Sequence, residues 1–130
     1  MEKIDGISIL VGTGECNANC KFCAGKQHRH LAHKKDGEII EDKLIEILNL
    51  CKDNNCKSVS LTGSGEPTKS PISVINILKL IDQYYKGLFK IKLYTNGILL
   101  SDYPFANWFL NNIKELGVTD IYLTLHELKI

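Results

Sequence analysis

Three cysteines stand close together near the N-terminus, at Cys16, Cys20 and Cys23, in the spacing C-x3-C-x2-C. Cysteine thiolates are the usual ligands of iron–sulfur clusters. A [4Fe–4S] cluster contains four irons, so three thiolates leave one iron with an open position, as catalytic metal sites do. An open position of this kind favours chemistry at the cluster over simple electron transfer.

The spacing differs from that of other common metal motifs. Ferredoxin loops have a further cysteine in a different pattern, and structural zinc sites pair two closely spaced couples. The remaining cysteines, Cys51 and Cys56, lack that paired spacing. We expect both to be free thiols, with Cys51 packed as a small apolar side chain on a helix. The pattern therefore favours an iron–sulfur cluster, with zinc on the same three cysteines as the alternative.

Phe22 stands directly before the last cysteine of the motif, and with it the motif resembles the signature of the radical S-adenosylmethionine (radical SAM) enzymes. The resemblance implies a [4Fe–4S] cluster on Cys16, Cys20 and Cys23, with S-adenosylmethionine (SAM) chelating the fourth iron. It implies an external electron donor of the flavodoxin or ferredoxin kind, cleavage of SAM to a 5′-deoxyadenosyl radical, and hydrogen abstraction from a substrate. Phe22 would then contact the SAM adenine through its backbone, while its ring packs nearby.

A second motif, Gly63-Ser64-Gly65-Glu66-Pro67, follows a predicted strand. Glycines let a backbone approach a ligand closely, and a carboxylate can pair with an ammonium group. The same residues also suit an ordinary glycine-rich turn. Beside the cysteine motif they resemble the GGEP motif of the family, with Ser64 in place of the first glycine. The resemblance implies that Glu66 binds the amino group of SAM, with further contacts from Gly63, Ser64 and Gly65.

Polar residues also end two later strands. Asn96 lies in a Thr-Asn-Gly turn that resembles one often seen in the family, and Thr124 and His126 share the polar face of the last predicted strand. Ligand-binding loops gather at the carboxyl ends of strands in α/β proteins. Asn96, Thr124 and His126 are therefore candidate contacts to SAM or substrate, although a single histidine also suits a structural role.

Strands and helices that alternate along the chain must position these motifs. Short apolar runs predict strands at 6–11, 58–62, 90–95 and 120–125. Helical periodicity predicts helices at 38–52, from an N-cap at Ser70 to Gly87, and from Ser101 or Asp102 to Gly117. This order is typical of an α/β fold with a parallel sheet.

Three of the predicted strands alternate apolar and polar residues, so helices are expected to cover only one face of the sheet. The polar face then lines a lumen or ligand cavity, or faces solvent. The resemblance implies a parallel partial (β/α) barrel of the radical SAM type, truncated after about four βα units. Family members usually continue to a fifth and sixth strand. We therefore expect residues 1–130 to form a single radical SAM core domain that is incomplete at its C-terminus, is a minimal variant, or is completed by a partner chain.

Composition narrows the classes of protein further. The net charge is +1, which gives no global electrostatic case for binding nucleic acid or membrane. No apolar run approaches the roughly 20 residues of a membrane span. The clustered, odd-numbered cysteines favour a reducing, cytoplasmic compartment.

The basic, histidine-rich segment Lys26–Lys35 fits either a solvated loop or a rim that faces phosphates. Three hypotheses follow for the whole chain. The leading one is a radical SAM enzyme or its N-terminal part. The others are a non-catalytic iron–sulfur or zinc module, or an inactive fragment, and a nucleic-acid-binding or partner-binding fragment.

Overall fold

The computed structural model describes residues 5–12, 35–63 and 65–123. Within them, strands alternate with helices, as the sequence predicts. The elements are β1 (Gly6–Val11), α2 (Glu41–Asp53), β2 (Ser58–Gly63), α3 (Pro71–Tyr85), β3 (Lys90–Thr95), α4 (Tyr103–Glu115) and β4 (Val118–Leu123), with short 3-10 helices η2 (Pro67–Lys69) and η3 (Ile98–Ser101). No helix among the described residues is long and apolar enough to cross a membrane.

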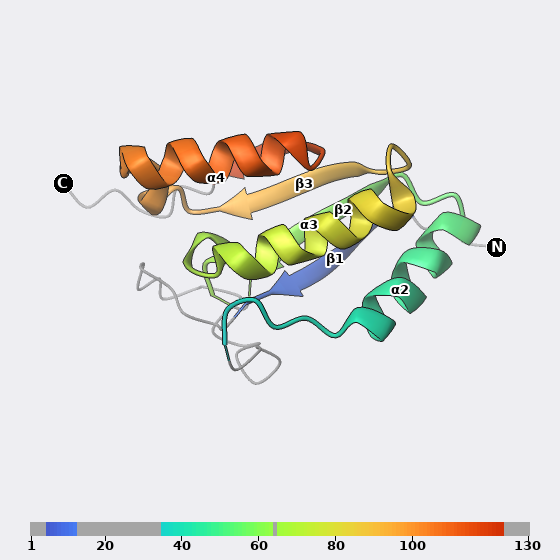
Figure 1. Ribbon diagram of the computed structural model, residues 1–130. Helices are drawn as coiled ribbons and strands as arrows, with labels where there is room; N and C mark the ends of the chain where they lie inside the picture. The colour runs from blue at the N-terminus through green and yellow to red at the C-terminus, as the bar shows by residue number, and fades with distance from the viewer. Residues whose placement is uncertain (1–4, 13–34, 64, 124–130) are drawn as a thin grey trace.

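The described strands form one parallel sheet in the order β1-β2-β3-β4. Its register aligns apolar residues in rows, with Val59 of β2 between Ile7 of β1 and Ile91 of β3. Helices α2, α3 and α4 lie on the same side of this sheet (Figure 1). The prediction of a parallel α/β fold with one covered face is confirmed.

The core lies between that covered face and the helices. Val59, Leu61 and Leu93 of the sheet are fully buried against apolar residues of α3 and α4. Each such side chain contributes about 1.5–3 kcal/mol through its burial. The helix side of the core consists chiefly of Leu44, Leu48, Val74, Ile77, Leu78, Ile81, Phe109 and Ile113.

Strand β4 departs from the predicted pattern. The alternating pattern predicts that its apolar residues Ile121 and Leu123 point to the helix side, where Ile121 lies near Leu110 and Ile113 of α4, but the two are 38% and 58% exposed. Among the described elements β4 is an edge strand, and α4 is the helix that packs beside it. With nothing described on its outer side, the apolar side chains of β4 stay accessible.

Cys51 and Cys56 also differ from expectation, because the structure joins them in a disulfide. Helix α2 ends just after Cys51, and Asn55 adopts a left-handed conformation that turns the chain back. The backbone N–H of Cys56 then donates to the carbonyl of Cys51 over 2.8 Å, and the two Cα atoms are 4.8 Å apart. The prediction of two free thiols is wrong, and the argument for a reducing compartment now depends on the other three cysteines.

The start of α3 is capped from far away in the sequence. Pro71 occupies the first turn as predicted, but the predicted N-cap Ser70 makes no side-chain capping bond. Instead, the Asp36 carboxylate accepts hydrogen bonds from the backbone N–H groups of Ile72 (3.2 Å) and Ser73 (2.8 Å). The Ser73 hydroxyl accepts in turn from the Gly37 N–H over 2.7 Å. Residues 35–37 are thereby fixed on the first turn of α3.

Candidate functional site

The described candidate residues meet where β2 and β3 end. β2 stops at Gly63 and β3 at Thr95, so the turn that carries Glu66 lies beside the turn that carries Asn96. Glu66 is only 5% exposed, and it is the N-cap of the short helix η2. A charged residue is rarely so deeply buried unless its surroundings stabilise the charge.

Hydrogen bonds from three residues converge on the Glu66 carboxylate. Its Oε2 atom accepts from the backbone N–H of Thr68 (2.9 Å), from the Thr68 hydroxyl, and from the Thr95 hydroxyl (2.6 Å). Its Oε1 atom accepts from the backbone N–H of Asn96 over 2.7 Å. Hydrogen bonds to an ionised carboxylate are the stronger kind, so this network fixes the side chain and joins the end of β2 to the end of β3.

These donors supply no positive charge. Within the described residues, the one ion pair joins Lys43 to Glu46 on the surface of α2. The carboxylate therefore combines deep burial with hydrogen bonding but has no described cation beside it. Oε1 accepts a single bond from these residues, which leaves it room to accept another. An ammonium group of a ligand would supply both a further hydrogen-bond donor and a positive charge.

Gly63 is required by the way this turn folds. A Cβ atom on Gly63 would come within 2.5 Å of the Gly65 carbonyl oxygen and 3.0 Å of Pro67 Cδ. The backbone therefore folds tightly against itself between β2 and Glu66. The sequence suggested glycines for close approach to a ligand, and the structure shows that Gly63 accommodates the turn itself.

Asn96 takes part through its backbone and through a local turn. Its N–H holds Glu66, and its side-chain Oδ1 accepts from the N–H of Ile98 over 3.0 Å. Gly97 follows in the left-handed region, at φ 77°, which favours glycine. The Thr-Asn-Gly sequence thus forms the turn that aims one N–H at the carboxylate.

Sequence reasoning missed Thr68 and Thr95, both of which are almost fully buried. Each places a hydroxyl on Glu66. A signal was present, because threonine stands two residues after Glu66 and again at the end of the next predicted strand.

Several predicted residues lie outside the described part of the chain. They are the three cysteines Cys16, Cys20 and Cys23, together with Phe22, Ser64, Thr124 and His126. Their roles stay predictions. Over residues 5–12, 35–63 and 65–123, no group of three or more His, Cys, Asp or Glu side chains could hold a metal ion.

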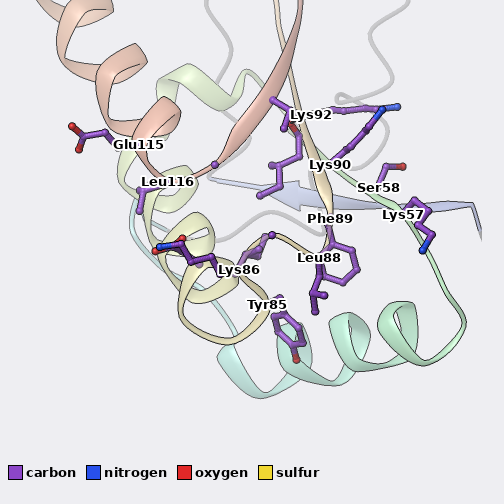
Figure 2. A pocket seen from close by; sticks show the side chains of 16 residues that line it. Lys57, Ser58, Tyr85, Lys86, Leu88, Phe89, Lys90, Lys92, Glu115 and Leu116 are labelled. Atoms are coloured by element: carbon purple, nitrogen blue, oxygen red, sulfur yellow. Dashed lines mark hydrogen bonds between the residues drawn. The ribbon is translucent and has the colours of Figure 1, made fainter.

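A cavity of about 860 Å³ lies at the other end of the sheet (Figure 2). Its lining residues lie at the starts of β2, β3 and β4, such as Lys57, Lys90 and Gly117, and at the C-terminal ends of α3 and α4. None of the residues that hold Glu66 lines it. This cavity is therefore separate from the candidate site.

Comparisons with known proteins match nearly the whole chain, including the cysteine motif and the motif that contains Glu66. A family model described as the Radical SAM superfamily matches residues 10–129. A relative in Clostridium novyi, named "Probable dual-specificity RNA methyltransferase RlmN", is 38% identical over 124 residues, covering 92% of this chain and 32% of that protein.

Two further relatives have other names. The GTP 3′,8-cyclase of Petrotoga mobilis is 29% identical over 126 residues, or 96% of this chain and 35% of that protein. The 7-carboxy-7-deazaguanine synthase of Clostridium acetobutylicum is 30% identical over 93 residues, or 70% of this chain and 38% of that protein. The chain thus spans about a third of the length of these relatives.

Proposed function

Because the chain belongs to the radical SAM superfamily, whose members matched here are enzymes, we propose that it supplies the cluster-binding and SAM-binding part of a radical SAM enzyme. Cys16, Cys20 and Cys23 would hold a [4Fe–4S] cluster. Glu66 would bind the amino group of SAM. When bound and reduced by an external donor protein, the cluster would supply the electron for reductive cleavage of SAM, and this chemistry would serve hydrogen abstraction from the substrate.

The observation that carries this proposal is the buried Glu66 carboxylate without a described cation. Thr68, Thr95 and the Asn96 N–H fix the carboxylate in one orientation at the end of the strands. A preoriented carboxylate in a poorly hydrated site attracts an ammonium group more strongly than one in water does. The threonine hydroxyls would keep Glu66 aimed while SAM binds.

The finer proposal concerns the substrate. The names of the three relatives contain RNA, GTP and a deazaguanine, which all carry a nucleobase or a close analogue of one. We therefore propose that the substrate of this chain also carries a nucleobase.

Anaerobic reconstitution with iron and sulfide tests the cluster. We expect about four irons and four sulfides per chain, and loss of both in Cys20→Ala. The matched control is the double variant Cys51→Ala/Cys56→Ala, which removes two cysteines outside the motif and should retain the cluster. Stoichiometric zinc without sulfide would favour the metal-module hypothesis instead.

Binding of SAM to the reconstituted chain tests Glu66. Glu66→Gln removes the charge and replaces one acceptor oxygen with an amide NH2 group, so SAM should bind about 10- to 100-fold more weakly at unchanged iron content, because a hydrogen bond to a charged group contributes about 1.5–3 kcal/mol. Equal SAM affinity in a folded, cluster-loaded Glu66→Gln variant would contradict the assigned role.

A further inference from the structure

The face of the sheet that carries no described helix bears an aromatic and basic cluster. The rings of Tyr94 on β3 and Tyr122 on β4 stack with their centroids 4.9 Å apart and their planes 14° from parallel. The Lys92 ammonium lies 5.9 Å from the centroid of the Tyr122 ring. We call Tyr94, Tyr122 and Lys92 the tyrosine platform.

The register of the sheet creates this platform. Tyr94 pairs directly with Tyr122, and Lys92 stands two residues before Tyr94 on the same face. A register shift at Ile91/Lys92 brings Lys92 opposite Asp120 and puts the two tyrosines side by side. In Figure 2 the side chains of Lys90 and Lys92 extend to the same side of β3, away from the helices.

The platform is open to a ligand. Tyr122 is 42% exposed although its ring already stacks on Tyr94. β4 is an edge strand of the described sheet, so no described strand covers the second face of the Tyr122 ring. A planar ring can extend the stack there, since bases stack on tyrosine with little dependence on sequence.

The charges around the tyrosine platform indicate which chemical group the bound ring should carry. Among the described residues Lys92 has no carboxylate within ion-pairing distance, and Lys90 lies two residues away on the same face. Asp120 is the acidic residue opposite Lys92, and its carboxylate accepts a hydrogen bond from the Thr119 hydroxyl. Two lysines beside one carboxylate leave this surface positive, which suits a phosphate.

The platform also lies at a suitable distance from the proposed SAM site. Tyr94 stands two residues before Asn96, whose N–H binds Glu66. Two residues of a strand span about 7 Å. A base on the platform would therefore lie next to the end of the sheet where the chemistry is proposed.

We propose that the tyrosine platform binds the nucleobase of a phosphorylated substrate, with Lys92 attracting its phosphate. This inference rests on the proposed function and deepens it, since it assigns a place and a chemical class to the substrate. The ligand is a nucleotide, either free or within RNA.

Equilibrium dialysis of the reconstituted chain against the four ribonucleoside 5′-monophosphates tests the platform. We expect at least one to bind, and Tyr122→Leu to weaken it about tenfold. Lys92→Met should weaken the monophosphate but leave the matching nucleoside unchanged. Tyr84→Leu and Lys79→Met, on exposed parts of α3, are the matched controls and should bind as the parent chain does.

A short oligoribonucleotide containing the preferred base distinguishes the two sources. Tighter binding of the oligonucleotide than of the monophosphate, lost in Tyr122→Leu, supports a base within RNA, and the reverse order supports a free nucleotide. The proposal is overturned if no monophosphate or oligonucleotide binds at millimolar concentration, or if Tyr122→Leu binds as well as Tyr84→Leu.

SAM affinity and iron content, measured on the same samples, separate this inference from the proposed function. Both should be unchanged in Tyr122→Leu. A platform that binds the adenine of SAM would instead lose SAM affinity in that variant, and this result would overturn the inference. Loss of the cluster in the parent chain would refute the proposed function even where nucleotide binding still depended on Tyr122.

Discussion

At the scale of single residues, Glu66 connects structure to proposed chemistry. Its carboxylate is held by two threonines and one backbone N–H that come from two strand ends. The sequence predicted Glu66 from its motif. It could not predict Thr95 as a partner, because that contact spans 29 residues and depends on β2 and β3 being neighbours.

Thr95→Val tests how much this network stabilises the fold. The change removes a hydroxyl and keeps the shape, which leaves one buried carboxylate oxygen with fewer donors. We expect the free energy of unfolding to fall by about 1–3 kcal/mol in urea denaturation. Thr62→Val, at a half-buried strand position whose side chain makes no hydrogen bond with a described residue, should change it by less than about 0.5 kcal/mol. Similar losses in both variants would mean that Thr95 acts through packing alone.

At the scale of elements, the sequence predicted the order and type of the described strands and helices, because each has a clear apolar period. β3 occupies the predicted residues. Helical spacing also predicts one apolar stripe on α3, and the structure buries all of its members, Val74, Ile77, Leu78, Ile81 and Tyr85. The cap of α3 was beyond such reasoning. The backbone N–H groups of Ile72 and Ser73 donate to Asp36, which stands 36 and 37 residues earlier in the chain. A contact over that distance cannot be predicted from the local sequence of the helix.

Asp36→Ala should therefore loosen the first turn of α3. Loss of a carboxylate that caps a helix N-terminus costs about 1 kcal/mol, partly through hydrogen bonds and partly through the helix dipole. Hydrogen exchange should become faster at the N–H groups of Ile72 and Ser73. The matched control is Asp102→Ala, because Asp102 precedes α4 without making a side-chain capping bond. If Asp102→Ala destabilised the chain as much as Asp36→Ala, the capping role would be refuted.

At the scale of the whole molecule, one face of the described sheet is covered by helices, as the alternating strands predict, and no described helix covers the other face. The sequence could not predict how exposed β4 is, because an apolar–polar pattern gives the direction of side chains and says nothing of what lies beyond an edge. Ile121, Tyr122 and Leu123 expose apolar surface on a strand whose outer side is paired with no described strand. Such an edge favours pairing with another strand.

We expect the 130-residue chain to self-associate through β4 as its concentration rises. A charge placed inside such a contact opposes it, so Ile121→Lys should keep the chain monomeric in sedimentation velocity runs. Ile72→Lys, at an exposed position on α3, should associate like the parent chain. A parent chain that sediments as a monomer at every concentration would show that the edge is protected.

Gly12 and Asp36 stand on either side of residues 13–34, and both lie against the N-terminal end of α3. A Cβ atom on Gly12 would overlap the side chain of Ser70, while Asp36 binds the next two N–H groups after Pro71. When both ends of a segment are anchored on one helix, changes in its length add little closure entropy. The intervening stretch could therefore be exchanged for a longer or shorter one without shifting the register of the sheet, which makes this scaffold a suitable recipient for grafted metal-binding loops.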